Sequence, residues 1–258
     1  MKEKIEEFIQ YIILEKKSSK STQQCYRTDL EKMQNYLLSK EVIEVEDVTE
    51  TDLNSFILYM EKQELSTATI ARNIVVVKKF FEFLKKKEYR NDDPTEYLRL
   101  PKMEKKEVSI LSMEEVQNLF ACINTDKKNG IRDKVMLLLF YSTGIYMNEL
   151  IELKKEDVNL SLGYLCCYRE KGNRVLSFHK KIGEYLKEYD EKERVHLEKE
   201  DTSFFLTRSG HAFSRQGVWK ILKKYREKAE MEVELTPFLL RNSYEVHRFL
   251  EKDILELL

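Results

Sequence analysis

The 258-residue sequence predicts a mainly α-helical fold of the α+β class, divided into two domains. Glycine (7) and proline (3) are scarce, which favours long helices joined by few tight turns. Apolar residues recur at helical spacing through most of the chain, and one segment alternates like a β-hairpin. Pro94 and Pro101 stand in a stretch without helical periodicity, which indicates a linker. We therefore place a helical domain at 1–100, a linker at 101–110 and a second domain at 111–258.

Four helices are expected in the first domain. The first is predicted by Ile5 and the apolar residues spaced helically after it. Ser21 and Gln24 have the spacing of a capping box at the start of the second helix. Thr49 and Asp52 mark the start of the third helix.

The fourth helix, "LSTATIARNIVVVKKFFEFLKKK", has one apolar stripe and begins at Ser66 or Thr67 as its cap. Arg72, Lys79 and Lys86 are seven residues apart, so they share one face, which lies opposite the apolar stripe. This basic stripe has two interpretations. It is either an ordinary solvent-exposed face or a surface that binds the phosphate backbone of a nucleic acid.

The second domain opens at "LSMEEVQNLF", where Ser112 and Glu115 have capping-box spacing. "DKVMLLLFYSTG" is apolar nearly all round, which predicts a central buried helix. "GYLCCYREKGNRVLSFH" alternates as a β-hairpin that turns near Gly172 and Asn173. "SRQGVWKILKKYREKA" and "LTPFLLRNSYEVHRFL" have helical spacing again.

Composition narrows the function classes. The net charge is −1, and residues 1–100 carry 17 Lys and Arg against 19 Asp and Glu, a net charge of −2. This near-neutral balance argues mildly against a nucleic-acid-binding protein. A local basic face is still compatible with it, so the positions of the charged residues have to be considered. No apolar run reaches the length of a membrane span, and the N-terminus is not a signal peptide. Four scattered cysteines and four separated histidines predict free thiols in a reducing cytoplasm and no metal site.

The order and spacing of several segments resemble the tyrosine recombinase (phage integrase, Xer-like) family over nearly the whole chain. The segments that carry this resemblance are "STQQCYRTDLEKMQNYL", "LSTATIARNIVVVKKFFEFL", "DDPTEYLRLPK", "LSMEEVQNLF", "IRDKVMLLLFYSTGIYMNELIELKKEDVNL", "EKGNRVLSFHK", "SRQGVWKILKKY" and "LTPFLLRNSYEVH".

The resemblance implies a four-helix SAM-like core-binding domain and a helical catalytic domain with a small β-hairpin. It implies that the two close as a clamp around double-stranded DNA, with a second recombinase-family protomer as a partner. In such enzymes a tyrosine hydroxyl attacks a DNA phosphate, and arginines stabilise the charge that develops on it. A lysine and histidines assist proton transfer, and no cofactor or metal is needed.

Several positions depart from the family pattern. Tyr146 stands where the first arginine is normal, and Phe238 stands where a histidine is normal. Lys171 matches the hairpin lysine, although the hairpin is about two residues shorter than usual. Arg241 matches the second arginine, and Asn242 replaces a further common histidine.

The remaining histidine or tryptophan, the nucleophilic tyrosine and the segment that contacts a neighbouring protomer would lie past Leu258. Tyr146 and Tyr244 are poor substitutes as nucleophiles, because nucleophile geometry is strict. A clipped end alone would leave the internal positions 146 and 238 unchanged. The two substitutions therefore predict a family member that no longer recombines DNA.

Three functions stay open: a non-catalytic DNA-binding accessory or regulatory factor, a protein that modulates an active recombinase without binding DNA, and an active recombinase or integrase whose tyrosine segment is missing or supplied in trans. We favour the first. The expected phosphate or base contacts come from both domains. They are Thr67, Thr69, Arg72, Asn73, Lys78, Lys79, Lys86, Arg215 and Gln216, with Lys171 and Arg241 as retained phosphate contacts.

Overall fold

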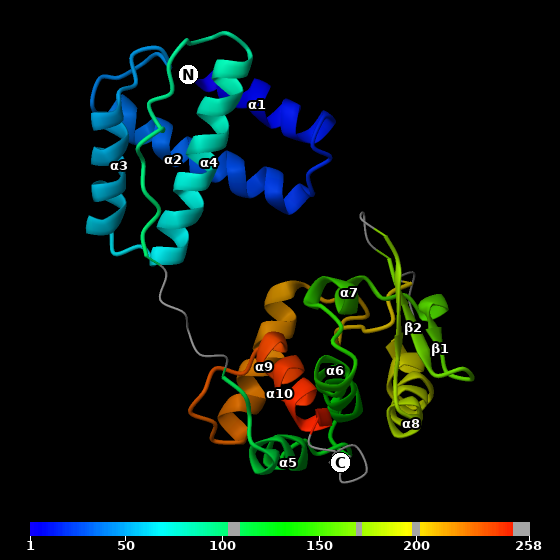
Figure 1. Ribbon diagram of the computed structural model, residues 1–258. Helices are drawn as coiled ribbons and strands as arrows, with labels where there is room; N and C mark the ends of the chain where they lie inside the picture. Colours follow the sequence, from blue (N-terminus) through cyan, green and yellow to red (C-terminus); the bar gives the residue numbers. More distant parts are fainter. Residues whose placement is uncertain (103–108, 169–171, 198–201, 250–258) are drawn as a thin grey trace. The chain divides into compact units, whose positions relative to one another are not determined.

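The computed structural model describes residues 1–102, 109–168, 172–197 and 202–249 (Figure 1). The chain divides into two compact units, Met1–Lys106 and Glu107–Leu258, and each is described by itself. The linker expected at 101–110 falls largely outside the described residues.

Over residues 1–102, unit 1 has four α-helices: α1 (Lys2–Leu14), α2 (Lys20–Leu38), α3 (Glu50–Lys62) and α4 (Thr67–Lys86). The capping box at Thr49 and Asp52 is confirmed, and Ser66 rather than Thr67 caps α4. The capping box expected at Ser21 is wrong. Extended backbone at Ser19 lets its hydroxyl accept the N–H of Thr22, so α2 begins earlier.

The core of unit 1 forms where α4 packs against the other three helices, and Figure 1 shows α4 crossing α2. The Phe8 ring of α1 contacts the rings of Phe80 and Phe83, with centroid separations of 5.6 and 5.4 Å. Val76 is also buried. The buried side of α4 is therefore wider than the single stripe that its sequence predicts.

This wider contact corrects the expected position of the basic stripe. Val76 and Phe83 follow Arg72 and Lys79 by four residues, so each lies beside a cation on the helix surface. The stripe consequently borders α1 and α2 instead of lying opposite the core. Three cross-helix contacts result: Arg72 donates two 2.9 Å bonds to Asp29, Lys79 donates to the Tyr26 hydroxyl at 2.7 Å, and Lys86 donates to the Tyr11 hydroxyl at 3.4 Å.

The described residues of unit 2 form six α-helices and a three-stranded antiparallel sheet of order β1-β2-β3. The helices are α5 (Met113–Ala121), α6 (Gly130–Ser142), α7 (Met147–Glu152), α8 (Lys180–Tyr189), α9 (Arg215–Lys228) and α10 (Pro237–Phe249). The strands are β1 (Val158–Asn159), β2 (Tyr164–Cys167) and β3 (Arg174–Ser177). Short 3₁₀-helices span Lys155–Asp157 and Val195–Leu197, and a short π-helix spans Asp190–Arg194.

Helix α6 is the centre of unit 2, as its apolar sequence predicts. It packs against α8 and α10, and Figure 1 shows the sheet on one side of it and α5, α9 and α10 on the other. Its one buried acid, Asp133, accepts bonds from Arg132, from Lys224 at 2.8 Å and from the Tyr225 hydroxyl at 3.0 Å. Burial raises the pKa of Tyr225 to about 12, so this hydroxyl remains a donor and ties α9 to α6.

The β-hairpin is confirmed, and so is the capping box at Ser112 and Glu115. Cys167 pairs with Arg174 at the open end of the described ladder. The short strand β1 was not expected, because two residues carry no readable alternation. The mainly α-helical fold with a small sheet agrees with the fold class that the sequence predicts. None of the described helices combines the length and apolar character needed to cross a bilayer.

The Arg72–Asp29 contact makes the three cations of the stripe unequal in their effect on stability. Asp29 is completely buried, so Arg72→Ala leaves its carboxylate without a partner. Because Arg72 is itself half exposed, we expect unfolding free energy to fall by ~2 kcal/mol, less than the loss of a fully buried pair. Lys79→Ala and Lys86→Ala, at exposed positions, should each cost under ~0.5 kcal/mol. Urea denaturation of the three variants measures this, and equal losses would contradict the assignment.

Candidate nucleic-acid interface

The loop between α6 and α7 contains Tyr146. Gly144 turns the chain there with a left-handed φ of +64°, a conformation that glycine adopts without strain. The Tyr146 N–H then donates to Glu149 at 2.8 Å, so Tyr146 precedes the first turn of α7. Its ring is 43% exposed. The loop therefore holds an aromatic ring at the surface, at the position where the sequence comparison expected an arginine.

Two guanidinium groups contact this ring. The guanidinium carbons of Arg174 and Arg241 each lie 4.7 Å from the ring centroid of Tyr146. Arg241 also lies 5.4 Å from the ring of Phe238, which precedes it by one helical turn in α10. Aromatic faces attract cations at these distances. We call Tyr146, Arg174, Arg241 and Phe238 the arginine–aromatic cluster.

Arg174 is held in this cluster by a buried acid and a loop carbonyl. Its Nε donates to Glu149 Oε1 at 2.9 Å, and its Nη2 donates to Glu149 Oε2 at 3.0 Å and to the carbonyl of Gly144 at 2.7 Å. The Glu149 side chain is only 3% exposed. This bidentate pairing fixes the guanidinium plane. Nη1 has no hydrogen-bond acceptor within the described part of the chain.

Arg241 reaches the cluster from α10 and lies against the same loop. A Cβ added at Gly144 would lie 3.2 Å from Arg241 Cδ, so the bare glycine makes room for the arginine stem. Arg241 is half-buried, yet it forms neither a hydrogen bond nor an ion pair with a residue in the described ranges. The neighbouring Asn242 has a buried side-chain nitrogen that lacks a partner there as well.

The structure brings together only part of the site expected from sequence. Tyr146, Phe238 and Arg241 meet, whereas Lys171 lies outside the described residues. Sequence reasoning missed Arg174 and Glu149. Their pairing depends on how the hairpin lies against α7, and neither "EKGNR" nor "YMNEL" encodes that placement.

The residues expected to contact DNA have different environments. Asn73 is fully buried and donates to the Thr69 carbonyl, so its expected contact with DNA is wrong. It lies on the widened buried side of α4. Arg72 is exposed but is bound to Asp29. The other expected residues are exposed or half-buried: Thr67, Thr69, Lys78, Lys79 and Lys86 on α4, and Arg215 and Gln216 on α9.

Helix α9 has a mixed basic and aromatic surface. Its apolar side is buried, while Arg215 and Gln216 lie exposed in its first turn. Trp219, the only tryptophan of the chain, is 41% exposed one turn later. Lys220 and Lys223 are exposed beside it. Cationic groups with an aromatic side chain suit a nucleic-acid surface, where phosphates and bases are both within reach.

Tyr244 belongs to the packing of unit 2. Its half-buried ring meets the Tyr141 ring edge-on at 5.1 Å, and the Tyr141 hydroxyl bonds His247 Nδ1 at 2.7 Å. Burial raises the pKa of Tyr141 and lowers the pKa of His247. The environment of Tyr244 is therefore an aromatic core, which agrees with the sequence argument against it as a nucleophile.

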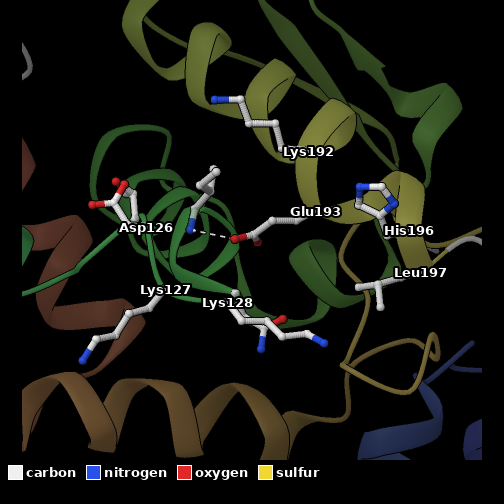
Figure 2. A pocket seen from close by; sticks show the side chains of 10 residues that line it. Asp126, Lys127, Lys128, Lys192, Glu193, His196 and Leu197 are labelled. Atoms are coloured by element: carbon white, nitrogen blue, oxygen red, sulfur yellow. Dashed lines mark hydrogen bonds between the residues drawn. The ribbon is translucent and has the colours of Figure 1, made fainter.

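A cavity of about 480 Å³ lies elsewhere in unit 2, at the start of α6 (Figure 2). Glu193 points from its wall toward this helix and accepts the N–H groups of Ile131 and Arg132 at 3.3 and 3.1 Å. The carboxylate thus caps α6, because Asn129 has no side-chain cap bond. No member of the arginine–aromatic cluster lines this cavity. Among the described residues, no group of three or more potential ligands is placed to hold a metal ion.

Gly144→Ala tests how far the loop positions Arg241. A left-handed alanine should lower the unfolding free energy by ~1 kcal/mol. Gly163→Ala is a matched control, because Gly163 also has a left-handed φ but its Cβ would make only an ordinary 3.5 Å contact. We expect similar losses in urea denaturation. Only Gly144→Ala should shift the Arg241 Nε–Hε signal in NMR spectra, and an unmoved signal would contradict the positioning role.

Comparison with known proteins agrees with this architecture. Residues 109–248 match the phage integrase family, and residues 5–88 match the phage integrase N-terminal SAM-like domain. Tyrosine recombinase XerD of Staphylococcus epidermidis is 36% identical over 247 residues, which cover 94% of this chain and 83% of that protein. The XerD of Staphylococcus haemolyticus is 34% identical with the same coverage.

Solved structures share the fold at lower identity. A lambda integrase dimer bound to a COC′ core site has a TM-score of 0.74 and 16% identity, covering 98% of this chain and 90% of that one. The XerH recombinase bound to a palindromic difH substrate has a TM-score of 0.71 and 19% identity, covering 90% and 69%. With both domains matched and a curated relative above one-third identity, the chain belongs to the tyrosine recombinase (phage integrase) family.

Proposed function

We propose that this chain is a DNA-binding member of the family that does not exchange strands and acts in the cytoplasm as an accessory or regulatory factor. The observation that carries the proposal is the Tyr146 ring in contact with two guanidinium groups. A phenol offers neither a positive charge nor a forked pair of donors. Removing one donor that stabilises transition-state charge costs on the order of 10² to 10³ in rate.

Phe238 supports the same conclusion. Its ring is 57% exposed and stacks near Arg241, at the position where the family pattern expects an imidazole. A hydrocarbon ring cannot accept or donate a proton, so any proton transfer from this position is lost. Two replacements within one cluster remove charge stabilisation and proton transfer together, while Arg241 stays available for a phosphate.

The expected ligand is double-stranded DNA. Lambda integrase and XerH were solved bound to a COC′ core site and a difH substrate, and their shared fold supports the same class of partner. The lambda integrase assembly is a dimer, which supports a second recombinase-family protomer as a further partner. Because this chain has a net charge of only −1, binding must depend on local cationic surfaces such as that of α9.

DNA binding can be followed with the protein's own fluorescence. Trp219 is the single tryptophan and lies beside Lys220 and Lys223, so binding of a short random-sequence duplex should change its emission. Lys220→Gln/Lys223→Gln should lower the slope of log affinity against log salt by about 1.8, since each lost phosphate contact contributes about 0.9. Lys187→Gln/Lys192→Gln is the matched control, because it removes the same two charges from exposed lysines on α8 and just after it, away from α9.

Absence of binding even at low salt, measured both by Trp219 emission and by anisotropy of a labelled duplex, would contradict the proposal. A salt-insensitive complex with an active recombinase would then favour the interaction-partner function. Binding without any change at Trp219 would instead remove α9 from the interface.

Strand cleavage is tested with nicked suicide duplexes, which trap a covalent protein–DNA adduct. We expect no adduct from this chain, because Tyr146 and Phe238 cannot replace an arginine and a histidine. The XerD of Staphylococcus epidermidis on its own recombination site serves as the positive control. An SDS-resistant adduct formed by this chain would contradict loss of activity and favour an active recombinase.

A further inference from the structure

Within the described residues, Arg241 has no anionic partner. A guanidinium has five N–H donors, and a half-buried one is costly unless those donors are satisfied. Arg241 finds two aromatic rings but no acceptor in the described part of the chain. Cation–π contacts return only about 0.5–2 kcal/mol each, and they leave the N–H groups unsatisfied.

Counted over the described residues alone, the arginine–aromatic cluster and the adjoining Glu149 carry an excess of positive charge. Arg174 and Arg241 contribute two cations, and Glu149 contributes one buried carboxylate that Arg174 already binds through two donors. Both guanidinium carbons lie 4.7 Å from one ring centroid, so they are separated by no more than twice that distance. Two like charges this close are stabilised by an anion that approaches both.

We propose that Arg174 and Arg241 form a two-guanidinium site that binds a backbone phosphate of DNA without restoring the catalytic donors that residue 146 does not carry. This inference rests on the proposed function and names the residues that bind the phosphate. Arg174 donates through Nη1, because its other side is bound to Glu149 and Gly144. Arg241 donates through its whole fork.

The loop between α6 and α7 sets the position of both arginines. Its Gly144 carbonyl accepts from Arg174, and the bare Cα of Gly144 makes room for the stem of Arg241. The guanidinium groups are thus placed by the protein before any ligand arrives. Preorganised donors lose little conformational freedom on binding, which favours affinity. The same loop presents the Tyr146 ring, whose centroid lies 4.7 Å from each guanidinium carbon and whose π-system attracts both cations.

A purely structural role for Arg174, as the partner of buried Glu149, is the competing explanation. A single Arg174→Gln change would remove the guanidinium partner of that buried carboxylate and so destabilise the site. We therefore compare Glu149→Gln with Glu149→Gln/Arg174→Gln, in which the buried charge is absent from both proteins. Thermal melts confirm that both are folded. In this background, removal of Arg174 should weaken DNA binding about tenfold and lower the salt slope by about 0.9.

Arg241→Gln should have a similar effect in the same background. If both arginines bind one phosphate, removing both should cost clearly less than the two separate losses combined. Arg248→Gln is the charge-matched control. It removes the same charge from an exposed position on α10, about 10 Å further along the helix, and should change affinity less than about twofold. A Glu149→Gln/Arg174→Gln protein that binds DNA like Glu149→Gln, with an equal salt slope, would overturn the inference and leave the proposed function standing.

A second measurement keeps the site testable if the protein binds no DNA at all. Dimethyl phosphate, a monoanionic diester, is titrated into ¹⁵N-labelled protein while the arginine Nε–Hε signals are followed. Saturable shifts confined to Arg174 and Arg241 would support the phosphate site even if the proposed function had failed. Unchanged signals for Arg174 at millimolar diester, beside a shifting Arg241, would assign the site to Arg241 alone and overturn the role of Arg174.

Discussion

The pairing of Arg174 with the buried carboxylate of Glu149 is the interaction on which the rest of the cluster depends. Glu149 belongs to α7 and Arg174 to β3, so this ion pair joins the sheet to the helical part of unit 2. A carboxylate that is 3% exposed needs a charged partner, and the bidentate guanidinium of Arg174 reaches both of its oxygens, while the Tyr146 N–H also donates to one of them. With Arg174 held in this way, its Nη2 also donates to the Gly144 carbonyl and its guanidinium contacts the Tyr146 ring. Its remaining donor is Nη1.

Replacing an arginine by tyrosine at position 146 changes the use of this site without emptying it. The ring removes one set of phosphate donors, yet its faces are stabilised by the two arginines that remain. Phe238 extends the same aromatic surface over Arg241. Such a surface can hold an anion by charge and hydrogen bonds, but the Phe238 ring provides no group for proton transfer where the family pattern has a histidine. In the function we propose, binding and chemistry are separable because different side chains supply them.

Local sequence patterns predict most of the fold. The helical spacing of apolar residues and the capping residues predict where the helices lie. The capping boxes of Thr49 with Asp52 and of Ser112 with Glu115 can be recognised within four consecutive residues. What they cannot predict is tertiary contact. The stripe of Arg72, Lys79 and Lys86 was expected opposite the core, and Asn73 was expected to be accessible. Both expectations failed because packing of Phe8 against Phe80 and Phe83 widens the buried side of α4. The role of Arg174 was not predicted either, because its contact with Glu149 is tertiary and the two residues are 25 positions apart in the chain.

The central claim is that this chain binds DNA and leaves it uncut. One sample tests it directly: the protein is incubated at low salt with a labelled, nicked random-sequence duplex pool, then divided between a native gel and an SDS gel. The account predicts a retarded complex on the native gel that weakens steeply with added salt, and only free DNA after SDS. An SDS-resistant protein–DNA species, or no retardation at any salt concentration, would contradict it.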